Sequence, residues 1–339
     1  MSLIDNCESN LFISKTPLRI SFFGGGSDID TYYKNSDFGF TLSAAIDSYI
    51  YVTIKRHSEM FEENIRLNYS KSEIISDVKD IENDIIRESL IHLDIGGPLY
   101  ISTVADSVAG TGLGTSSSFA VGLLNALHAF QGRKKSAGQL AEEACYIEID
   151  RIDKPIGKQD QYAAAFGGMN TFKFLPDDSV RVEPLILDSG LQQDIFDHLV
   201  VFWTGIRRSA DDILSEQREK TGDRITHMHN IRNIAINMRD EFVNGTVTPK
   251  RFGDALAESW ESKKRMASGI SSGFIDECFD KGIKAGAWGG KVAGAGGGGF
   301  LLFACPKDKQ DDLRNAMKGM AEVKFACDPH GSRMIVGGM

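Results

Sequence analysis

The sequence predicts a protein of two domains in which β-strands and α-helices are mixed. The chain has 339 residues, and at roughly 150 residues per domain this length favours two domains or one large one. Strand patterns dominate the first half, whereas long, charged, helix-favouring stretches fill residues 209–268. We expect the boundary between about 185 and 198, which divides the chain into domains 11–192 and 193–339.

The composition is that of an ordinary globular protein, with 42% hydrophobic and 25% charged residues. A net charge of −9 argues against nucleic acid or an anionic membrane as the main partner. The N-terminus lacks the basic-then-apolar layout of a signal peptide, and no apolar run approaches the ~20 residues that span a bilayer. The five scattered cysteines fit reduced thiols. We therefore expect a cytoplasmic protein, and leave its oligomeric state open, a homodimer included.

The spacing of apolar residues predicts the individual strands and helices. Alternating and β-rich stretches predict strands at 12–23, 39–56, 65–69, 99–104, 168–174, 180–184 and 198–203, and later at 300–305 and 323–326. Helical spacing predicts helices at 77–93, 115–130, 136–152, 209–241, 249–268, 273–286 and 307–320. Ser136 is the expected N-cap of the third of these helices.

A glycine-rich loop, Gly110 to Ser118, lies between the strand at 99–104 and the helix from Thr115. Glycines let the backbone approach a bulky anion, and the N–H groups that open a helix favour negative charge. The hydroxyl groups of residues 115–118 could reach phosphate oxygens or Mg²⁺. A Gly/Ser-rich turn without a ligand would have a similar composition, but hydroxyl groups at the start of a helix favour a phosphate site.

A second glycine motif, G-x-G-x-x-G at Gly294, Gly296 and Gly299, comes directly before the strand at 300–305. In a dinucleotide-binding fold this motif follows a strand and opens a helix, so its place here is wrong for a nicotinamide dehydrogenase. No G-x-x-x-x-G-K-[ST] motif occurs either. The loop at 110–118 therefore remains the predicted phosphate site.

Two carboxylates, Glu148 and Asp160, follow the glycine loop. Phosphoryl transfer needs Mg²⁺ near the phosphates and a group that orients or deprotonates the attacking hydroxyl, and one carboxylate could serve each need. Arg19, within an apolar strand, needs an anionic partner. Each of these residues could also be an ordinary solvated or structural charge. Asp28, in a glycine-rich turn, could contact a polyhydroxy substrate.

Three ordered blocks resemble the GHMP kinase superfamily: PLRISFFGGGSD at 17–28, VAGTGLGTSSS at 108–118 and KVAGAGGGGFLLF at 291–303. The resemblance implies an α+β fold of two domains, namely an N-terminal domain with a left-handed βαβ unit and a C-terminal ferredoxin-like domain. It also implies ATP and Mg²⁺ as cofactors. Val108-Ala109 occupies a place where the family usually carries proline.

The family match implies roles for the matching residues. Asp160 would be the base or orienting group with Arg19 beside it, and Ser116 and Glu148 would bind Mg²⁺. The ATP phosphates would lie against Gly110, Thr111, Gly112, Leu113, Gly114, Thr115, Ser116 and Ser117.

Within the superfamily, GGGSD resembles the kinases that phosphorylate the C1 hydroxyl of sugars. Stretches 203–214, 258–271 and 287–300 are similar to members that convert D-glycero-D-manno-heptose 7-phosphate to the 1,7-bisphosphate, towards GDP-heptose. A phosphorylated sugar needs cationic partners, although ordinary surface cations would have the same sequence pattern. The candidate substrate contacts are Gly25, Gly26, Asp28, Lys158, Arg207, Arg208, Lys263, Lys264, Gly296 and Gly297.

Three alternatives remain open from the sequence. A kinase of fucose or galactose would need no clamp for a second phosphate. The decarboxylase branch of the superfamily acts on a branched diphosphate acid, and the sugar-type GGGSD block counts against it. A non-catalytic sensor of sugar and ATP should have lost catalytic positions, whereas Arg19, Ser116, Glu148 and Asp160 all remain.

Overall fold

The computed structural model describes residues 10–57, 60, 63–107, 110–207, 211–219 and 224–337. Its first sheet is built on two long antiparallel strands, β1 (Leu11–Phe23) and β2 (Gly39–Arg56). The remaining strands of this eight-stranded sheet are β3 (Ile65–Asn68), β4 (Ser72–Ile75), β5 (Leu99–Ala105), β6 (Met169–Phe174), β7 (Val180–Pro184) and β12 (Arg333–Val336). The order is β12-β1-β2-β5-β3-β4, with β6 and β7 extending from the other end of β2.

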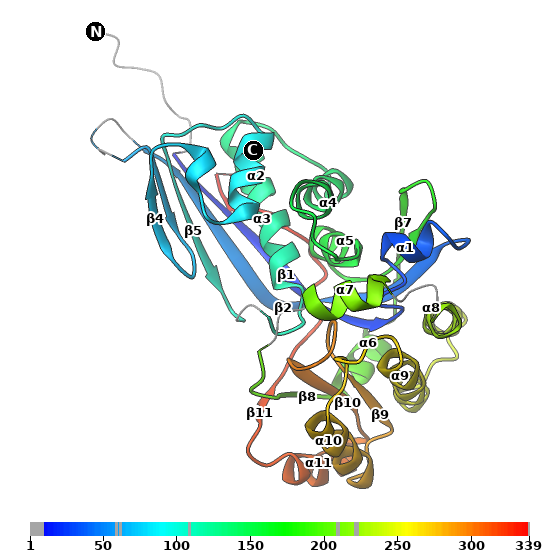
Figure 1. Cartoon of the computed structure of the whole chain (residues 1–339). Helices are drawn as coiled ribbons and strands as arrows, with labels where there is room; N and C mark the ends of the chain where they lie inside the picture. Colours follow the sequence, from blue (N-terminus) through cyan, green and yellow to red (C-terminus); the bar gives the residue numbers. More distant parts are fainter. Residues whose placement is uncertain are drawn as a thin grey trace.

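Helices cover one face of this sheet (Figure 1). They are α2 (Asp84–His92), α3 (Thr115–Phe130), α4 (Ala137–Cys145) and α5 (Gln159–Phe166), while the short α1 (Asp30–Tyr33) follows β1. Helix α3 is buried over most of its circumference, as expected for the apolar run FAVGLLNALHAF. The parallel pair β3 and β5 is connected through α2. Ser136 caps α4, as the sequence predicts, in a capping box with Gln139.

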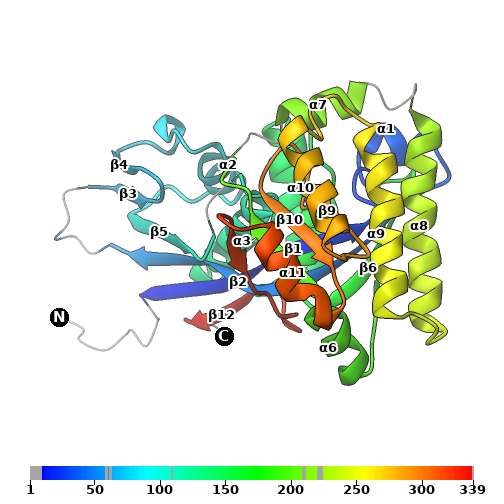
Figure 2. The same cartoon turned by 90° about the horizontal axis from the view of Figure 1, so that it is seen from below.

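The second sheet has four antiparallel strands in the order β11-β8-β10-β9. They are β8 (Leu199–Trp203), β9 (Gly289–Val292), β10 (Phe300–Ala304) and β11 (Ala321–Val323). The helices of this half are α6 (Ser189–Asp197), α7 (Asp211–Glu219), α8 (Ile225–Val243), α9 (Pro249–Lys264), α10 (Gly273–Lys284) and α11 (Gln310–Ala316). Figure 2 shows α8 and α9 side by side at one end of the molecule. This strand order, with helices in the β8–β9 and β10–β11 connections, is the predicted ferredoxin-like arrangement.

The two halves of the chain are joined by more than the single connection before β8. Strand β12, close to the C-terminus, pairs antiparallel with β1 in the first sheet. The backbone N–H of Asp328 also donates to the Ala45 carbonyl at 3.0 Å across this junction. The division at 192/193 remains a proposal, and the final strand lies with the N-terminal sheet. Among the described residues, no helix is long and apolar enough to cross a membrane.

Strand β2 and helix α3 have the predicted bounds, whereas the helix expected over 249–268 ends earlier, at Lys264. The helix expected over 77–93 is wrong in its first turns, because a 3₁₀ turn at Val78–Asp80 precedes a shorter α2. The expected strand at 323–326 is also wrong, since β11 ends at Val323. Part of the helix expected over 209–241 lies outside the described residues. Strands β4, β9 and β12 were not predicted. Each has four residues, which are too few to show a clear alternation of apolar and polar side chains.

Candidate active site

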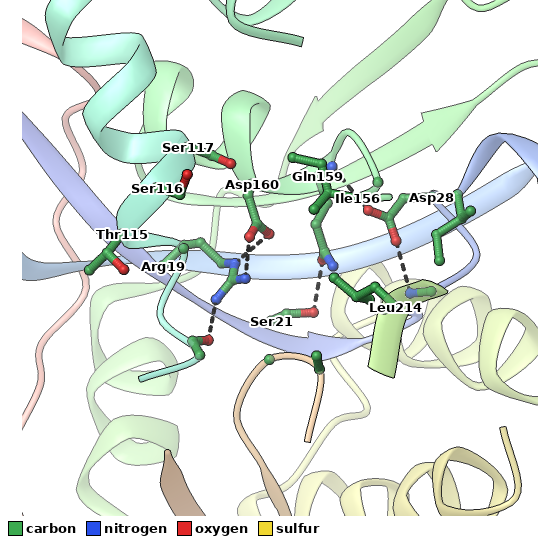
Figure 3. Close-up of a pocket in the computed structure, with 18 of the residues that line it drawn as sticks. Arg19, Ser21, Asp28, Thr115, Ser116, Ser117, Ile156, Gln159, Asp160 and Leu214 are labelled. Carbon is green, nitrogen blue, oxygen red and sulfur yellow. Dashed lines mark hydrogen bonds and ion pairs between the residues drawn. The ribbon is translucent and has the colours of Figure 1, made fainter. Parts of the chain in front are cut away.

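A cavity of about 290 Å³ lies where the glycine loop of the first domain meets the glycine-rich segment of the second. Figure 3 shows Arg19, Asp160, Ser116 and Asp28 around it. Its walls come from β1 and the turn after it, the 110–117 loop, the segment 148–160, and elements of the second half of the chain. The lining side chains and glycines are Arg19, Ser21, Gly25, Gly26, Asp28, Ile29, Gly110, Gly112, Gly114, Thr115, Ser116, Ser117, Glu148, Lys154, Ile156, Gly157, Gln159, Asp160, Leu214, Lys263, Lys291, Gly294 and Ala295.

Arg19 and Asp160 form a bidentate ion pair at the centre of this cavity. The guanidinium donates from Nε to Asp160 Oδ1 at 2.6 Å and from a terminal nitrogen to Oδ2. Its other terminal nitrogen donates to the Gly112 carbonyl at 2.6 Å. Asp160 lies in the first turn of α5, where a carboxylate is favoured by the helix dipole. Arg19 thus fixes both the carboxylate and the glycine loop, which is the strong two-point geometry of an arginine fork.

Ser116 and Glu148 form a second polar pair. Ser116 Oγ donates to Glu148 Oε1 at 2.7 Å, and Lys154 Nζ lies 3.0 Å from that hydroxyl oxygen and 3.3 Å from Oε1. Gln161 donates to the other carboxylate oxygen at 2.7 Å. Glu148 is fully buried. It lies in a π-helical turn, Tyr146–Arg151, which directly follows the α-helical hydrogen bonds of α4. Such turns are rare and frequently mark functional sites.

These two oxygen ligands fit a small hard cation. A hydroxyl and a carboxylate are oxygen ligands of the kind that Mg²⁺ takes, and the ion keeps further positions for water and substrate phosphates. The Lys154 ammonium already contacts both oxygens, so the geometry accommodates a positive charge at this point. Ser116 and Glu148 are therefore suited to hold the Mg²⁺ that the sequence resemblance implies.

The two glycine-rich segments pack directly against each other. Gly112 has φ +83°, and a Cβ atom there would lie 2.2 Å from the carbonyl oxygen of Ala293. Gly294 has φ +77°, and its Cβ would lie 2.6 Å from the Cα of Gly112. Any side chain at either position would force the segments apart as well as strain the backbone. The second glycine motif is therefore a packing partner of the phosphate loop.

Three charged side chains occupy the opposite end of the cavity. Asp28 accepts hydrogen bonds from Gly26 N at 2.8 Å and from Gln159 N, at the start of α5, at 3.2 Å. Lys263 Nζ donates to Gly25 O at 3.1 Å and to Gln217 Oε1 at 3.0 Å. Lys291 Nζ donates to the carbonyls of Ser21 at 2.8 Å and Phe22 at 3.0 Å. All three are buried, and their hydrogen bonds go to neutral groups.

Burial displaces the pKa values of these three groups. Burial, and then the charge of Asp160, raise the pKa of the Asp28 carboxyl above its usual range. Burial lowers the pKa of Lys263 to about 8, although the nearby Asp28 opposes that shift. Burial, followed by the charges of Lys263 and Arg19, lowers the pKa of Lys291 to about 7. Near neutral pH, this end of the cavity can therefore exchange protons when a charged ligand enters.

Several predicted contacts lie away from the cavity. Lys158 lines a neighbouring cavity, which shares Asp28, and donates to Asp178 Oδ1 at 3.0 Å. Lys264 pairs with Glu261 at 2.7 Å, and Arg207 is exposed. Arg208, like Val108-Ala109, lies outside the described residues.

Other predicted positions support the cavity from behind. Gly297 is buried and donates to the Ile270 carbonyl at 2.8 Å, and Gly296 packs on the same residue. Thr111 and Leu113 are buried too, and the Leu113 carbonyl accepts from the Arg19 backbone N–H at 3.1 Å. Gly294 and Ala295 reach the cavity in place of Gly296 and Gly297.

Sequence reasoning missed several lining residues, above all Lys154 and Lys291. A signal existed for Lys291, because a lysine among glycines and apolar residues in the third block needs a buried partner. Ser21 and Gln159 were also missed; Ser21 Oγ donates to Gln159 Oε1 at 2.8 Å. For Leu214, on α7, no local pattern distinguishes the side chain that lines the cavity from its neighbours.

Two family matches cover much of this site. Residues 78–168 match the GHMP kinases N terminal domain, and residues 247–322 match the GHMP kinases C terminal domain. The chain is 31% identical over 324 residues to the D-glycero-alpha-D-manno-heptose 7-phosphate kinase of Campylobacter jejuni, covering 90% of this chain and 92% of the relative. It is also 24% identical over 351 residues to the galactokinase of Pyrococcus furiosus, covering 92% of this chain and 94% of that protein.

A solved structure is also similar to this chain over nearly its whole length. The crystal structure of a D-glycero-D-manno-heptose 1-phosphate kinase from Bacteriodes thetaiotaomicron superposes with a TM-score of 0.76 at 28% identity, covering 95% of this chain and 98% of that one. Full-length similarity, both family matches and the predicted fold thus agree. The chain belongs to the GHMP kinases, as an ATP-using kinase of the sugar-kinase type.

Proposed function

We propose that the protein transfers the γ-phosphoryl group of ATP to the C1 hydroxyl of D-glycero-D-manno-heptose 7-phosphate. The observation that carries this proposal is the full-length similarity to a heptose 7-phosphate kinase, in a chain whose cavity has anion-binding groups at both ends. The glycine loop and Ser116 line one end, and Lys263 and Lys291 line the other. A substrate with a sugar ring and a distant phosphate would match that layout.

At the donor end, the phosphates of ATP would lie against Gly110–Ser117 and the N-terminus of α3. Ser116 and Glu148 would hold Mg²⁺, which, when bound, supplies neutralisation of charge on the transferring phosphoryl group. Lys154, in contact with both residues, would add a second positive charge. Arg19 keeps the loop carbonyl of Gly112 and the carboxylate of Asp160 in fixed positions.

At the acceptor end, Asp160 would accept a hydrogen bond from the C1 hydroxyl and aim its oxygen at the γ-phosphorus. A bond forms between that oxygen and phosphorus, and the bond from phosphorus to the β–γ bridging oxygen breaks. The hydroxyl proton passes to Asp160 or leaves with the product, and ADP carries the released electron pair. Asp28 would contact ring hydroxyls, since it lines the cavity and caps α5.

Lys263 is our candidate for the contact with the second phosphate. Among the described cations that the sequence proposed as phosphate contacts, it is the one that lines the central cavity. Its two hydrogen bonds go to neutral oxygens. A dianionic phosphate would therefore compete well for this ammonium, because two opposite charges attract each other strongly in a buried site.

The names of two relatives differ in the position of the phosphate, so the test must include both sugar phosphates. ADP release should be measured with heptose 7-phosphate, heptose 1-phosphate, free heptose, fucose and galactose, followed by phosphorus NMR of the product. We expect the highest kcat/KM with the 7-phosphate and a new signal from a phosphate on C1. Faster turnover of heptose 1-phosphate or of a free sugar would refute the substrate assignment. ADP release with none of the five would argue for a sensor.

A further inference from the structure

We propose that Lys154 and Mg²⁺ are alternative partners of the Ser116–Glu148 pair, so that Lys154 opposes the binding of free metal until ATP enters. The inference rests on the function proposed above, in which Ser116 and Glu148 hold the metal. It gives Lys154 a positioning role of its own, because this side chain would determine whether metal binds alone or together with the nucleotide.

The ammonium of Lys154 contacts the two oxygens that would bind the metal. Its Nζ lies 3.0 Å from Ser116 Oγ and 3.3 Å from Glu148 Oε1. A Mg²⁺ ion would use the same two oxygens at about 2.1 Å. Two positive charges in contact with one pair of oxygens repel each other, and the repulsion is strong where water is scarce. Lys154 must therefore withdraw from these oxygens when a metal binds to them.

The fold directs both the backbone and the side chain of Lys154 back to Glu148. Glu148 lies in the π-helical turn, and Asp153, just after that turn, has a φ of +59°, a left-handed conformation that is uncommon outside glycine. The backbone N–H of Lys154 then donates to the Glu148 carbonyl at 3.0 Å. The Lys154 side chain is 19% exposed, so it lies against the cavity wall and does not extend into solvent.

Glu148 needs a positive partner at all times. Its side chain is 0% exposed, and among the residues that the structure describes Lys154 is its ion-pair partner. The other carboxylate oxygen accepts from Gln161, which is neutral. A buried carboxylate that loses its counter-charge destabilises the protein strongly. When no metal is bound, Lys154 therefore supplies that charge, and free Mg²⁺ must displace it.

The phosphates of ATP would give Lys154 another anionic partner. Lys154 lines the same cavity as Ser116 and the glycine loop. Lysine carries a point charge on a flexible four-carbon stem, so its ammonium can turn from a carboxylate to a nearby phosphate. That movement would release Ser116 Oγ and Glu148 Oε1 to the metal. Nucleotide and metal would then each favour the binding of the other, whereas metal alone would bind weakly.

The test is a titration with Mn²⁺, which takes the same oxygen ligands as Mg²⁺ and loses its solution EPR signal when it binds. Without nucleotide, Lys154→Met should bind Mn²⁺ at least about tenfold more tightly than wild type. Lys154→Gln, which removes the charge but keeps a hydrogen-bond donor, should show the same gain and serves if the methionine variant does not fold. In the matched control Lys71→Met, the lost ion pair with Glu82 is 64% and 63% exposed, and the Mn²⁺ affinity should equal that of wild type.

Two further measurements locate the effect. Addition of Glu148→Gln to Lys154→Met should abolish the gain in Mn²⁺ affinity. Lys154→Met should also melt at a lower temperature than wild type without metal, and recover when Mg²⁺ is added. Equal Mn²⁺ affinity in wild type and both Lys154 variants would overturn the proposal, as would a gain that persists without the Glu148 carboxylate. Either result would leave the heptose kinase proposal intact if ADP release is observed, so the two proposals can fail separately.

Discussion

The two ends of the candidate active site differ in how their charges are balanced. At the donor end, Arg19 pairs with Asp160, and Lys154 contacts Glu148. At the acceptor end, Asp28, Lys263 and Lys291 are buried with hydrogen bonds to neutral groups only. The pKa values follow this difference, since Lys263 and Lys291 are lowered to about 8 and about 7.

The donor end is therefore preorganised, whereas the acceptor end lacks the negative charge that a phosphorylated ligand would bring. Buried cations whose hydrogen bonds go only to neutral groups raise the free energy of the ligand-free protein. A phosphate that enters relieves this cost, so part of the binding free energy comes from the removal of an unfavourable state. We therefore expect substitutions at the donor end to impair catalysis, and substitutions at the acceptor end to impair recognition.

The largest effect is expected from Asp160→Asn. The amide keeps the size of the side chain but loses one carboxylate acceptor and the basicity, so kcat should fall by about 1,000-fold. The Kd for ATP should change by less than about threefold. Asp311→Asn, at a residue whose side chain is 92% exposed, is the matched control. An unchanged kcat in Asp160→Asn would remove this residue from the mechanism.

Glu148→Gln should have the next largest effect. The substitution removes the buried negative charge that Ser116, Lys154 and Gln161 surround, and with it a proposed ligand of Mg²⁺. We expect kcat/KM for ATP to fall by about 100-fold and the Mg²⁺ concentration for half-maximal rate to rise. Titration of the rate against Mg²⁺ measures both. A normal Mg²⁺ requirement would show that Glu148 has only a structural role.

Lys263 tests the acceptor end. Its pKa of about 8 means that the side chain is charged below pH 8 and neutral above it. The KM for the phosphorylated sugar should therefore rise by about tenfold between pH 7 and pH 9, as the protonated fraction falls. Lys263→Met should raise KM at pH 7 by a similar factor and remove the pH dependence. A KM that rises equally for free heptose would contradict contact with the phosphate.

The smallest effect is expected where the two glycine segments meet. Gly112→Ala and Gly132→Ala both place alanine at positive φ, +83° and +69°, but only Gly112 has backbone atoms within 4 Å of the added Cβ. Both should lose about 1 kcal/mol of unfolding free energy from backbone strain. Gly112→Ala should lose about 1–2 kcal/mol more from the clash and raise KM for ATP. Equal stability of the two variants would mean that the segments separate readily.

The sequence was sufficient to predict site residues whose polar or charged side chains conflict with their apolar or glycine-rich surroundings. Arg19 in an apolar strand and the hydroxyl groups of the glycine loop both indicated ligands, and the structure brings them to one cavity. The overall α+β architecture and the ferredoxin-like sheet were predictable from the family blocks. Long elements were also predictable, since β2 and α3 contain enough positions to establish a period.

Side-chain direction could not be predicted. Lys263 and Lys264 are adjacent in α9, yet one enters the cavity and the other pairs with Glu261 on the surface. A difference of about 100° around the helix decides this, and only tertiary packing fixes it. The π-helical turn at Glu148 has no distinct sequence signal either. Lys154 follows that turn, so its approach to Ser116 became visible only in the folded chain.

The return of β12 to pair with β1 has a consequence for biosynthesis. Chains emerge from the ribosome N-terminus first, and domains usually fold in that order. Here, the sheet that carries Arg19 includes β12, which follows all four strands of the second sheet in sequence. The first sheet is therefore completed only after every strand of the second sheet has been synthesised, and a nascent chain exposes one edge of β1 until residues 333–336 have emerged. Premature termination would leave that edge available for pairing with other chains.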